Sequence, residues 1–246
     1  MGSVIVITSG KGGTGKTSLT GGVGASLALL GKQVLCLDSD VGLRNLDITL
    51  GMTDAALMDF SDVMAGRCDL SRAAVPHPTV SGLHLLTAPL TLPGDFPGEA
   101  GFQALLQQAR EAYDYVLIDS PAGLGPGFRL AVCGADRAIV VAVSDPSSLR
   151  DAQRVVTQLS QLETIHLVVN RVRPRLLRRQ NTTIDDAMDT AGLPLLGLVP
   201  EDPKVVLAAT EGRPLAQLGA RRGAVRAYEN IARRLTGQPV PLMGLR

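Results

Sequence analysis

The sequence predicts a single α/β domain in which a mostly parallel central sheet of about seven or eight strands is flanked by helices. Short apolar runs rich in β-branched residues alternate with longer amphipathic stretches along the 246 residues, which is the pattern of a parallel sheet. The run 138–143 has no polar alternation, as expected for a strand covered on both faces. No linker, repeat or low-complexity tract divides the chain, and a hydrophobic content of 45% suffices for one substantial core.

The individual elements follow in order from these patterns. We expect strands near residues 3–8, 33–38, 83–87, 114–119, 137–143, 164–170 and 194–199, with helices between most of them. One helical pattern spans 18–30, and an amphipathic stretch at 225–235 predicts a last helix packed on the core. We therefore expect a domain over 1–236 and a short tail over 237–246, where two prolines and two glycines allow no more than a turn of helix.

A phosphate-binding motif follows the first predicted strand. Residues 10–17 read Gly-Lys-Gly-Gly-Thr-Gly-Lys-Thr, which matches G-x-x-x-x-G-K-[ST] between a predicted strand and a predicted helix. The glycines allow the backbone to turn with positive φ and to bring amide groups against phosphate oxygens. Lys16 should reach the β- and γ-phosphates, and Thr17 should bind magnesium. The predicted nucleotide contacts of this segment are Gly10, Lys11, Gly12, Gly13, Thr14, Gly15, Lys16, Thr17 and Ser18.

Lys11 is a second lysine that an ordinary phosphate loop does not need. It is either a solvated loop residue or a second cation placed to touch nucleotide. The segment Gly-Lys-Gly-Gly-x-Gly-Lys-Thr resembles the deviant Walker A signature of the ParA/MinD ATPases. That resemblance implies a P-loop NTPase fold of the deviant Walker A type and a homodimer that forms when ATP is bound. It also implies that Lys11 crosses the dimer interface to the partner's ATP, which would make hydrolysis depend on dimerisation.

Carboxylates follow two of the predicted strands, at the edge of the sheet where ligands of such folds bind. Asp38 and Asp40 come at the end of the second strand. An acid at this place can bind the magnesium shell or orient the attacking water, and the alternative is a turn in which the aspartate bonds its own backbone. Asp119 ends an apolar strand as a Walker B aspartate does, and Gly123 adds an amide that can meet the γ-phosphate.

Both acidic segments resemble the MinD branch of the family. Residues 38–47 resemble its switch I segment, and residues 119–123 resemble its switch II segment. The resemblance gives Asp40 the role of positioning the water and gives Asp38 contact with the metal through its hydration shell. The predicted catalytic residues are therefore Lys11, Lys16 and Asp40, and the predicted metal contacts are Thr17, Asp38 and Asp119.

The sequence favours adenine over guanine as the base. A guanine-specific site usually ends a strand with Asn-Lys-x-Asp, whereas the sixth predicted strand ends with Asn170-Arg171-Val172-Arg173. The amide of Asn170 can pair with the adenine edge. By resemblance, the segment after the seventh strand also reaches the base, so the predicted base contacts are Asn170, Arg171, Pro200, Glu201 and Asp202. No histidine is placed as a general base, and positioning with charge neutralisation suffices for slow hydrolysis of ATP to ADP and phosphate.

Segments 43–47 and 147–154 also resemble MinD proteins, which implies an ATPase that takes part in septum placement with MinC-like and MinE-like regulators. MinD proteins end in a basic amphipathic helix that binds membrane, and the tail of this chain departs from that pattern. The alternative is a ParA-like or flagellar-number-regulator-like ATPase that binds DNA or a protein partner. DNA contact would use Arg171, Arg173, Arg175, Arg178 and Arg179, with Arg221 and Arg222 further on, although a solvated surface also explains such a cluster.

The composition argues against several other classes. The net charge is +1, so no overall field recruits nucleic acid or membrane. No apolar run approaches the ~20 residues that span a bilayer, and the chain starts without a signal-peptide pattern. The three cysteines lack C-x-x-C spacing, which argues against a zinc site or a disulfide framework. We expect a cytoplasmic protein, with peripheral attachment at the inner face of the cell membrane left open.

Overall fold

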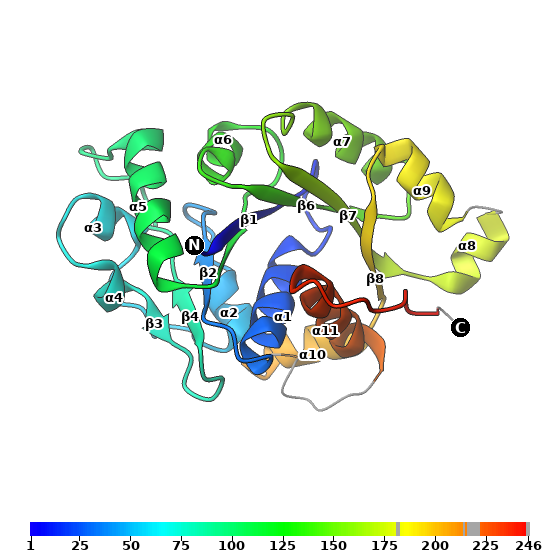
Figure 1. The fold of residues 1–246 in the computed structure, drawn as a ribbon, viewed down its shortest axis with the longest axis horizontal. Coiled ribbons are helices and arrows are strands. Elements are labelled where there is room, and N and C mark those ends of the chain that lie inside the picture. Colours follow the sequence, from blue (N-terminus) through cyan, green and yellow to red (C-terminus); the bar gives the residue numbers. More distant parts are fainter. Residues whose placement is uncertain (181–182, 214, 216–221, 245–246) are drawn as a thin grey trace.

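An eight-stranded sheet forms the centre of the computed structural model, which describes residues 1–180, 183–213, 215 and 222–244 (Figure 1). The strand order is β3-β4-β2-β5-β1-β6-β7-β8, and every pairing is parallel except that of β3 with β4. The strands are β1 (Ser3–Thr8), β2 (Val34–Asp38), β3 (Val75–Pro76), β4 (Leu83–Leu86), β5 (Tyr115–Asp119), β6 (Arg137–Val143), β7 (Thr164–Val172) and β8 (Leu195–Pro200). The predicted mostly parallel α/β fold is confirmed.

Strand β3 is the element that the sequence prediction missed. Its two residues pair antiparallel with β4 at the edge of the sheet, Val75 opposite Leu85 and Pro76 opposite His84. Two residues are too few to show a periodic pattern, and proline is tolerated in sheets mainly at such an edge. Strand β7 also runs past its predicted end at residue 170, because Val172 still pairs with Pro200 of β8.

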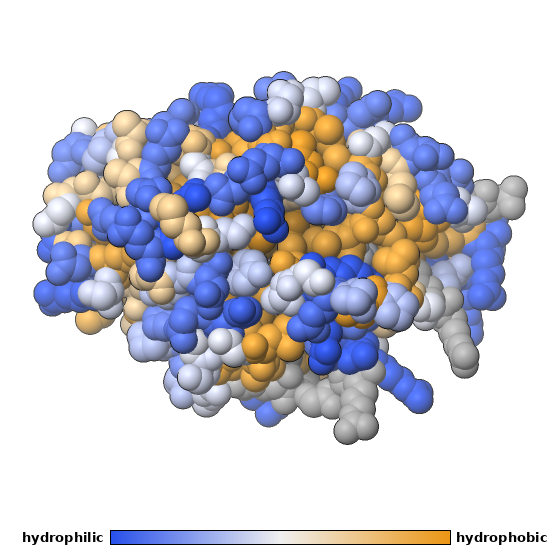
Figure 2. All heavy atoms as spheres, viewed as in Figure 1, coloured by the Kyte–Doolittle hydropathy of each residue, from blue (hydrophilic) through white to orange (hydrophobic). Residues whose placement is uncertain are grey.

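Helices cover both faces of the sheet, and each face buries its own apolar core. Helices α1, α2, α10 and α11 lie on one face, and α3 to α7 and α9 lie on the other (Figure 1). The hydrophobic residues show between these layers, while the outer helices carry hydrophilic ones (Figure 2). The helices are α1 (Lys16–Leu29), α2 (Leu46–Leu50), α3 (Phe60–Met64), α4 (Leu70–Ala73), α5 (Gly98–Ala112), α6 (Pro126–Val132), α7 (Pro146–Thr157), α8 (Pro174–Gln180), α9 (Ile184–Ala191), α10 (Pro203–Thr210) and α11 (Gly223–Leu235).

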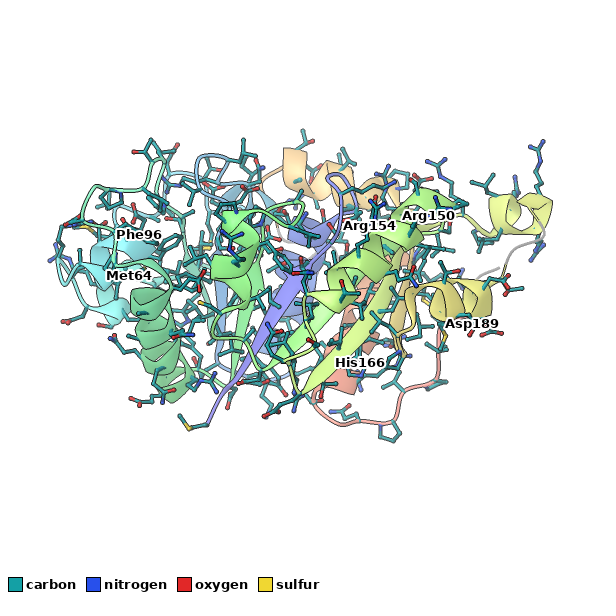
Figure 3. All side chains as sticks on the ribbon, turned by 90° about the horizontal axis from the view of Figure 1, so that it is seen from above. Met64, Phe96, Arg150, Arg154, His166 and Asp189 are labelled. Carbon is teal, nitrogen blue, oxygen red and sulfur yellow. The ribbon has the colours of Figure 1, made fainter. Side chains whose placement is uncertain are left out.

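The parallel strands end along one edge of the sheet, which lies uppermost in Figure 3. Strand β1 lies between β5 and β6, so the chain winds toward β2 on one side of β1 and toward β8 on the other. Doubly wound sheets open a crevice at the point where the winding direction changes. The loop that follows β1 emerges at that point, which places the predicted phosphate loop in the crevice.

One arginine holds the C-terminal tail against the domain. Helix α11 ends at Leu235, and the described residues after it form neither helix nor strand. The guanidinium of Arg234 donates hydrogen bonds to the carbonyl oxygens of Leu196 (2.7 Å), Val240 (3.1 Å) and Pro241 (2.7 Å). Residues 245–246 of the predicted tail lie outside the described part of the chain. Within that part, no helix is both long enough and apolar enough to cross a membrane.

Candidate nucleotide-binding site

The loop between β1 and α1 has the conformation that its glycines make possible. Gly13 and Gly15 have φ of 75° and 90°, in the left-handed region that favours glycine. A Cβ atom on Gly15 would lie 2.3 Å from Nδ2 of Asn170, so a side chain there would collide with β7. The hydroxyl of Thr14 is buried and has no hydrogen-bond partner among the described residues. A buried polar atom without a partner indicates a missing ligand or water.

Side chains at the end of β7 hold this loop by hydrogen bonds to its backbone. Nδ2 of Asn170 donates to the carbonyl oxygen of Thr14 at 2.8 Å, and Nη1 of Arg171 donates to that of Gly13 at 3.2 Å. Oδ1 of Asn170 accepts from the backbone N–H of Arg171 at 2.9 Å, and Arg171 itself has φ of 53°. The sequence predicts both residues as base contacts and does not indicate these hydrogen bonds, because nothing in it signals a contact over more than 150 residues.

Lys16 is held among acidic groups near the floor of the crevice. Its side chain is buried, and Nζ donates to Oγ of Ser9 at 3.2 Å. Burial lowers the pKa of Lys16, and the negative charges of Asp119 and Asp40 oppose that shift. The sheet and the loop thus bring together three residues that the sequence predicted as site members, Lys16, Asp40 and Asp119.

Two buried carboxyl groups face each other across neighbouring strands. Asp38 ends β2 and Asp119 ends β5, and the parallel register pairs them directly. Their exposures are 1% and 2%. Burial is the main cause that raises the pKa of Asp38 to about 6 and that of Asp119 to about 7, and each is raised further by neighbouring negative charge. The hydroxyl of Thr20 donates to Oδ1 of Asp119 at 3.3 Å and lowers its pKa, as Thr17 also does.

Asp38 also shapes the segment that carries Asp40. Its Oδ1 accepts from the backbone N–H of Asp40 at 2.9 Å, and its Oδ2 accepts from that of Leu46 at 3.1 Å. This is the turn that the sequence analysis gave as the alternative to metal binding. It fixes the loop 39–46 over the strand end and leaves Asp40 only half-buried, near the charge of Lys16.

The side chain of Lys11 binds residues of its own chain. Its Nζ lies 3.2 Å from both carboxylate oxygens of Asp145 and 3.0 Å from Oγ of Ser147. Asp145 also caps α7, because its Oδ1 accepts from the backbone N–H of Ser148 at 2.9 Å. The sequence predicted Lys11 as a site residue but gave no indication of Asp145 or Ser147 as its partners.

A pocket of about 750 Å³ opens between the phosphate loop and the segment after β8, within the range that binds drug-sized ligands. At one end it is lined by Gly13, Gly15, Lys16, Thr17 and Ser18, and at the other by Asn170, Arg171, Pro200, Glu201 and Asp202. These are ten of the residues that the sequence predicted as nucleotide contacts. The pocket is also lined by Val205 and Val206 of α10 and by Tyr228 of α11, which the sequence analysis did not single out.

The second predicted switch segment lies beside the loop as well. A Cβ atom on Gly12 would be 4.0 Å from Cβ of Ala122, so the segment after β5 borders the phosphate loop. Gly123 follows with φ of 84°, a conformation that favours glycine. Its backbone therefore follows directly on the residue that borders the phosphate loop, and the contact of its amide with the γ-phosphate stays a prediction.

The donor set at the end of the sheet fits magnesium better than a softer metal. In the described ranges, no three side chains of His, Cys, Asp or Glu converge as a ready-made metal shell. Thr17, Asp38 and Asp119 supply one hydroxyl and two carboxyl groups, all oxygen donors. Magnesium prefers oxygen and is usually held by one or two protein groups together with phosphates and water.

A buried lysine and buried carboxyl groups around a glycine-rich loop are what a nucleotide with its cation requires, and they place the protein among the P-loop nucleotide-binding proteins. The family model of the CobQ/CobB/MinD/ParA nucleotide binding domain matches residues 5–215, and the chain belongs to this family.

Relatives within that family confirm the resemblance to the MinD branch. The septum site-determining protein MinD of Bacillus subtilis is 41% identical over 250 residues, which cover 100% of this chain and 93% of that protein. The MinD of Synechocystis is 39% identical over 246 residues, covering 99% and 92%.

Solved structures agree with these relatives. A chain of the MinC:MinD cell division protein complex of Aquifex aeolicus superposes with a TM-score of 0.91 at 38% identity, covering 98% of each chain. The MinD of Pyrococcus horikoshii complexed with Mg-ADP superposes with a TM-score of 0.83 at 28% identity, covering 96% of each.

Proposed function

We propose that this chain is an ATPase domain over residues 1–236 that binds ATP with magnesium and hydrolyses it to ADP and phosphate. The observation that carries the proposal is the position of Lys16, whose buried side chain lines the pocket of about 750 Å³ and lies close enough to Asp119 and Asp40 for both charges to raise its pKa against the lowering effect of burial. Family membership supports the same chemistry, since a relative in Pyrococcus horikoshii was solved with Mg-ADP.

The residues of the loop bind and orient the phosphates. The phosphates would be bound by backbone amides of 10–18 and by the charge of Lys16, and five residues of this segment line the pocket. Thr17 and Asp119 would hold the magnesium, with Asp38 acting through its hydration shell. When bound, the cation neutralises charge on the phosphates. Asp40 is the half-buried carboxylate beside Lys16, and we assign it the orientation of the attacking water.

The base end of the pocket is suited to adenine. The apolar side chains of Val205 and Val206 and the ring of Pro200 line one wall, beside polar backbone after β8. Nδ2 of Asn170 has one hydrogen engaged by the carbonyl oxygen of Thr14, which leaves the second for the base. Arg171, Glu201 and Asp202 complete this end, and Glu201 is itself paired with Arg173 and Arg171.

Dimerisation would be the switch of this ATPase. Lys11 lies at the rim of the crevice with about a third of its side chain exposed, and the pair that it forms with Asp145 is within one chain. We propose that ATP draws Lys11 away from Asp145 and across a homodimer interface to the nucleotide of the partner. Hydrolysis is then slow in the monomer and faster in the dimer, and loss of the γ-phosphate releases the segments that carry Asp40 and Gly123.

In the cell we propose a role in division-site placement, as the names of the relatives suggest. A MinC-like partner is supported by the MinC:MinD complex of Aquifex aeolicus, and a MinE-like regulator by family resemblance alone. The ATP-bound dimer would act in the cytoplasm and attach peripherally to the inner face of the membrane. The test is ATP hydrolysis by the purified chain with magnesium, which should be abolished by Lys16→Ala and by chelation of the cation.

DNA contact is the second candidate. Helix α8 projects from the edge of the molecule in two views (Figures 1 and 3), and a pocket of about 640 Å³ beside it is lined by Arg173, Arg175, Arg178 and Arg179. Arg171 and Arg173 are paired with Glu201, whereas no ion pair is found in the described residues for Arg175, Arg178 or Arg179. Of the two further arginines, Arg222 is exposed and Arg221 lies outside the described residues.

One experiment separates the two roles. The chain is sedimented with anionic liposomes in ADP and in ATP, and the same samples are assayed for a shift of duplex DNA. Lipid binding that needs ATP supports the membrane-attached division role. The other outcome is that the chain does not bind lipid but binds DNA in the presence of ATP, and that the triple variant Arg175→Ala, Arg178→Ala, Arg179→Ala loses this DNA binding. That outcome would move the protein to the DNA-binding class.

A further inference from the structure

Tyr228 is a buried polar residue at the nucleotide pocket that no family motif of the sequence includes. It lies on α11, on the face that packs against α1, and is 2% exposed. It lines the 750 Å³ pocket together with Ser18 of α1 and Val205 of α10. It also lines a small cavity of about 20 Å³ that Ser18 and Val205 share.

The ring of Tyr228 packs against a glycine of α1, whose lack of a side chain lets the ring approach the helix backbone. A Cβ atom on Gly22 would lie 2.2 Å from Cδ2 of the ring, so the ring packs directly on the backbone of α1. Packing of the ring on this backbone restricts its movement. The hydroxyl is therefore held in place before any ligand arrives.

No hydrogen bond joins the hydroxyl to the described residues. Although Tyr228 is 2% exposed as a residue, its hydroxyl is not among the fully buried side-chain atoms that lack a partner, so the oxygen retains access to the pocket that the residue lines. Burial raises the pKa of Tyr228 and the nearby charge of Asp202 raises it further, so the group remains a protonated donor. Asp202 is already occupied, because Oδ1 accepts from Lys204 N–H and Oδ2 from Ala224 N–H, each at 3.0 Å. A protonated hydroxyl that reaches the pocket without a protein partner can donate a hydrogen bond to a ligand or a water there.

The position of Tyr228 along the pocket indicates which part of a nucleotide it would meet. Residues 13 and 15–18 line the phosphate end, and residues 170–171, 199–203 and 205–206 line the proposed base end. Tyr228 is flanked by Ser18 of the first group and Val205 of the second, and the sugar lies between phosphates and base. We propose that the hydroxyl of Tyr228 hydrogen-bonds a hydroxyl of the nucleotide's ribose, which favours ribonucleotides over deoxyribonucleotides; this rests on the proposed nucleotide site.

The test is the affinity of the full chain for three nucleotides, ADP, 2′-deoxy-ADP and 3′-deoxy-ADP, measured by calorimetry with magnesium. The variant Tyr228→Phe keeps the ring on Gly22 and removes the hydroxyl alone. The parent chain should bind ADP more tightly than one of the deoxy analogues by about three- to ten-fold, the range of one neutral hydrogen bond. Tyr228→Phe should lower the affinity for ADP by the same factor. Its affinity for the deoxy analogue that the parent binds more weakly should equal that of the parent.

The matched control is Tyr113→Phe, because Tyr113 is a buried tyrosine in the core on the opposite face of the sheet. It should leave all three affinities unchanged. The proposal would be overturned if the parent and Tyr228→Phe bound ADP with equal affinity. It would also be overturned if Tyr228→Phe lost affinity equally for all three nucleotides, because the hydroxyl would then contact the phosphates or the base. If the parent chain binds none of the three, the nucleotide site itself is wrong.

Discussion

Nζ of Lys11 and the carboxylate of Asp145 form an ion pair within one chain, with both N···O distances at 3.2 Å. Lys11 is therefore not extended into solvent, where a second protomer would meet it. Ser147 provides a further acceptor at 3.0 Å, so the ammonium group has three protein oxygens around it. To reach the nucleotide of a partner, Lys11 must give up all of these contacts. Asp145 therefore competes with the partner's nucleotide for the ammonium group of Lys11.

Removing the charge of Asp145 should favour the ATP-bound dimer. Asp145→Asn retains a side chain that can cap α7 and takes away the ionic partner of Lys11. A half-exposed pair contributes about 0.5–1 kcal/mol, and a dimer breaks two of them, so its dissociation constant should fall roughly 5- to 30-fold. Sedimentation velocity across a concentration series in Mg-ATP measures this.

The control for that variant is Asp189→Asn, which removes an exposed carboxylate of α9 (Figure 3) that makes no hydrogen bond or ion pair with Lys11. It should leave the dimer unchanged. If Asp145→Asn weakens the dimer instead, the ion pair supports the assembled state and our interpretation of it as a competitor is wrong.

Asp40 and Lys16 should separate hydrolysis from binding. Asp40→Ala should retain ATP and accumulate dimer while losing turnover, because the carboxylate that orients the water is gone. Lys16→Ala should lose nucleotide binding, because the phosphates lose their buried cation. Equilibrium binding of ATP and phosphate release are measured on both variants. Normal turnover by Asp40→Ala would remove that residue from the catalytic assignment.

Asn170 should contribute to the stability of the chain without any nucleotide. Asn170→Ala leaves the carbonyl of Thr14 and the N–H of Arg171 without their side-chain partner. A buried group left unsatisfied costs about 1–3 kcal/mol, so the nucleotide-free variant should melt several degrees lower. Calorimetric melting without nucleotide measures this. An unchanged melting temperature with weakened ATP binding would mean that Asn170 serves the base alone.

Magnesium should bind with release of protons near neutral pH. In the absence of the cation, burial raises the pKa of Asp119 to about 7 and that of Asp38 to about 6, from 3.8 for both. The folded chain therefore holds more protons than the unfolded chain between about pH 4 and 7, and the contribution of these groups to stability is lost as the pH rises through that window.

A cation favours the charged carboxylates, so Mg-nucleotide should bind more weakly at pH 6 than at pH 8. Calorimetry at pH 6.5 in buffers of different ionisation enthalpy counts the protons released. Asp119→Asn should release fewer, since one titrating group is gone. Binding of Mg-nucleotide with no proton release in the parent chain would place the cation away from these carboxyl groups.

Local patterns in the sequence predict much of this molecule. The phosphate loop and the strands that end at Asp38 and Asp119 are contiguous segments with their own periodicity, so their place in a parallel sheet follows from general rules. Contacts between distant segments do not follow in this way. Lys11 and Asp145 are 134 residues apart, and Asn170 and Thr14 are 156 apart, so only the folded sheet brings each pair together.

Tyr228 escaped sequence reasoning for a different reason. It belongs to the apolar face of an amphipathic helix, where a buried tyrosine is an ordinary core residue. Only the packing of its ring on Gly22 and its place between Ser18 and Val205 set it apart.

The most direct test of ATP-driven dimerisation is sedimentation velocity of the full chain in Mg-ADP and in Mg-ATP, with Asp40→Ala present to preserve the ATP. The account predicts that the Asp40→Ala chain is a monomer in ADP and a dimer in ATP. When Lys11→Ala is added to it, the chain should remain a monomer in ATP, although Lys16 still holds the nucleotide. A Lys11→Ala chain that dimerises as strongly as its parent, or a parent that binds ATP and remains monomeric, would contradict it.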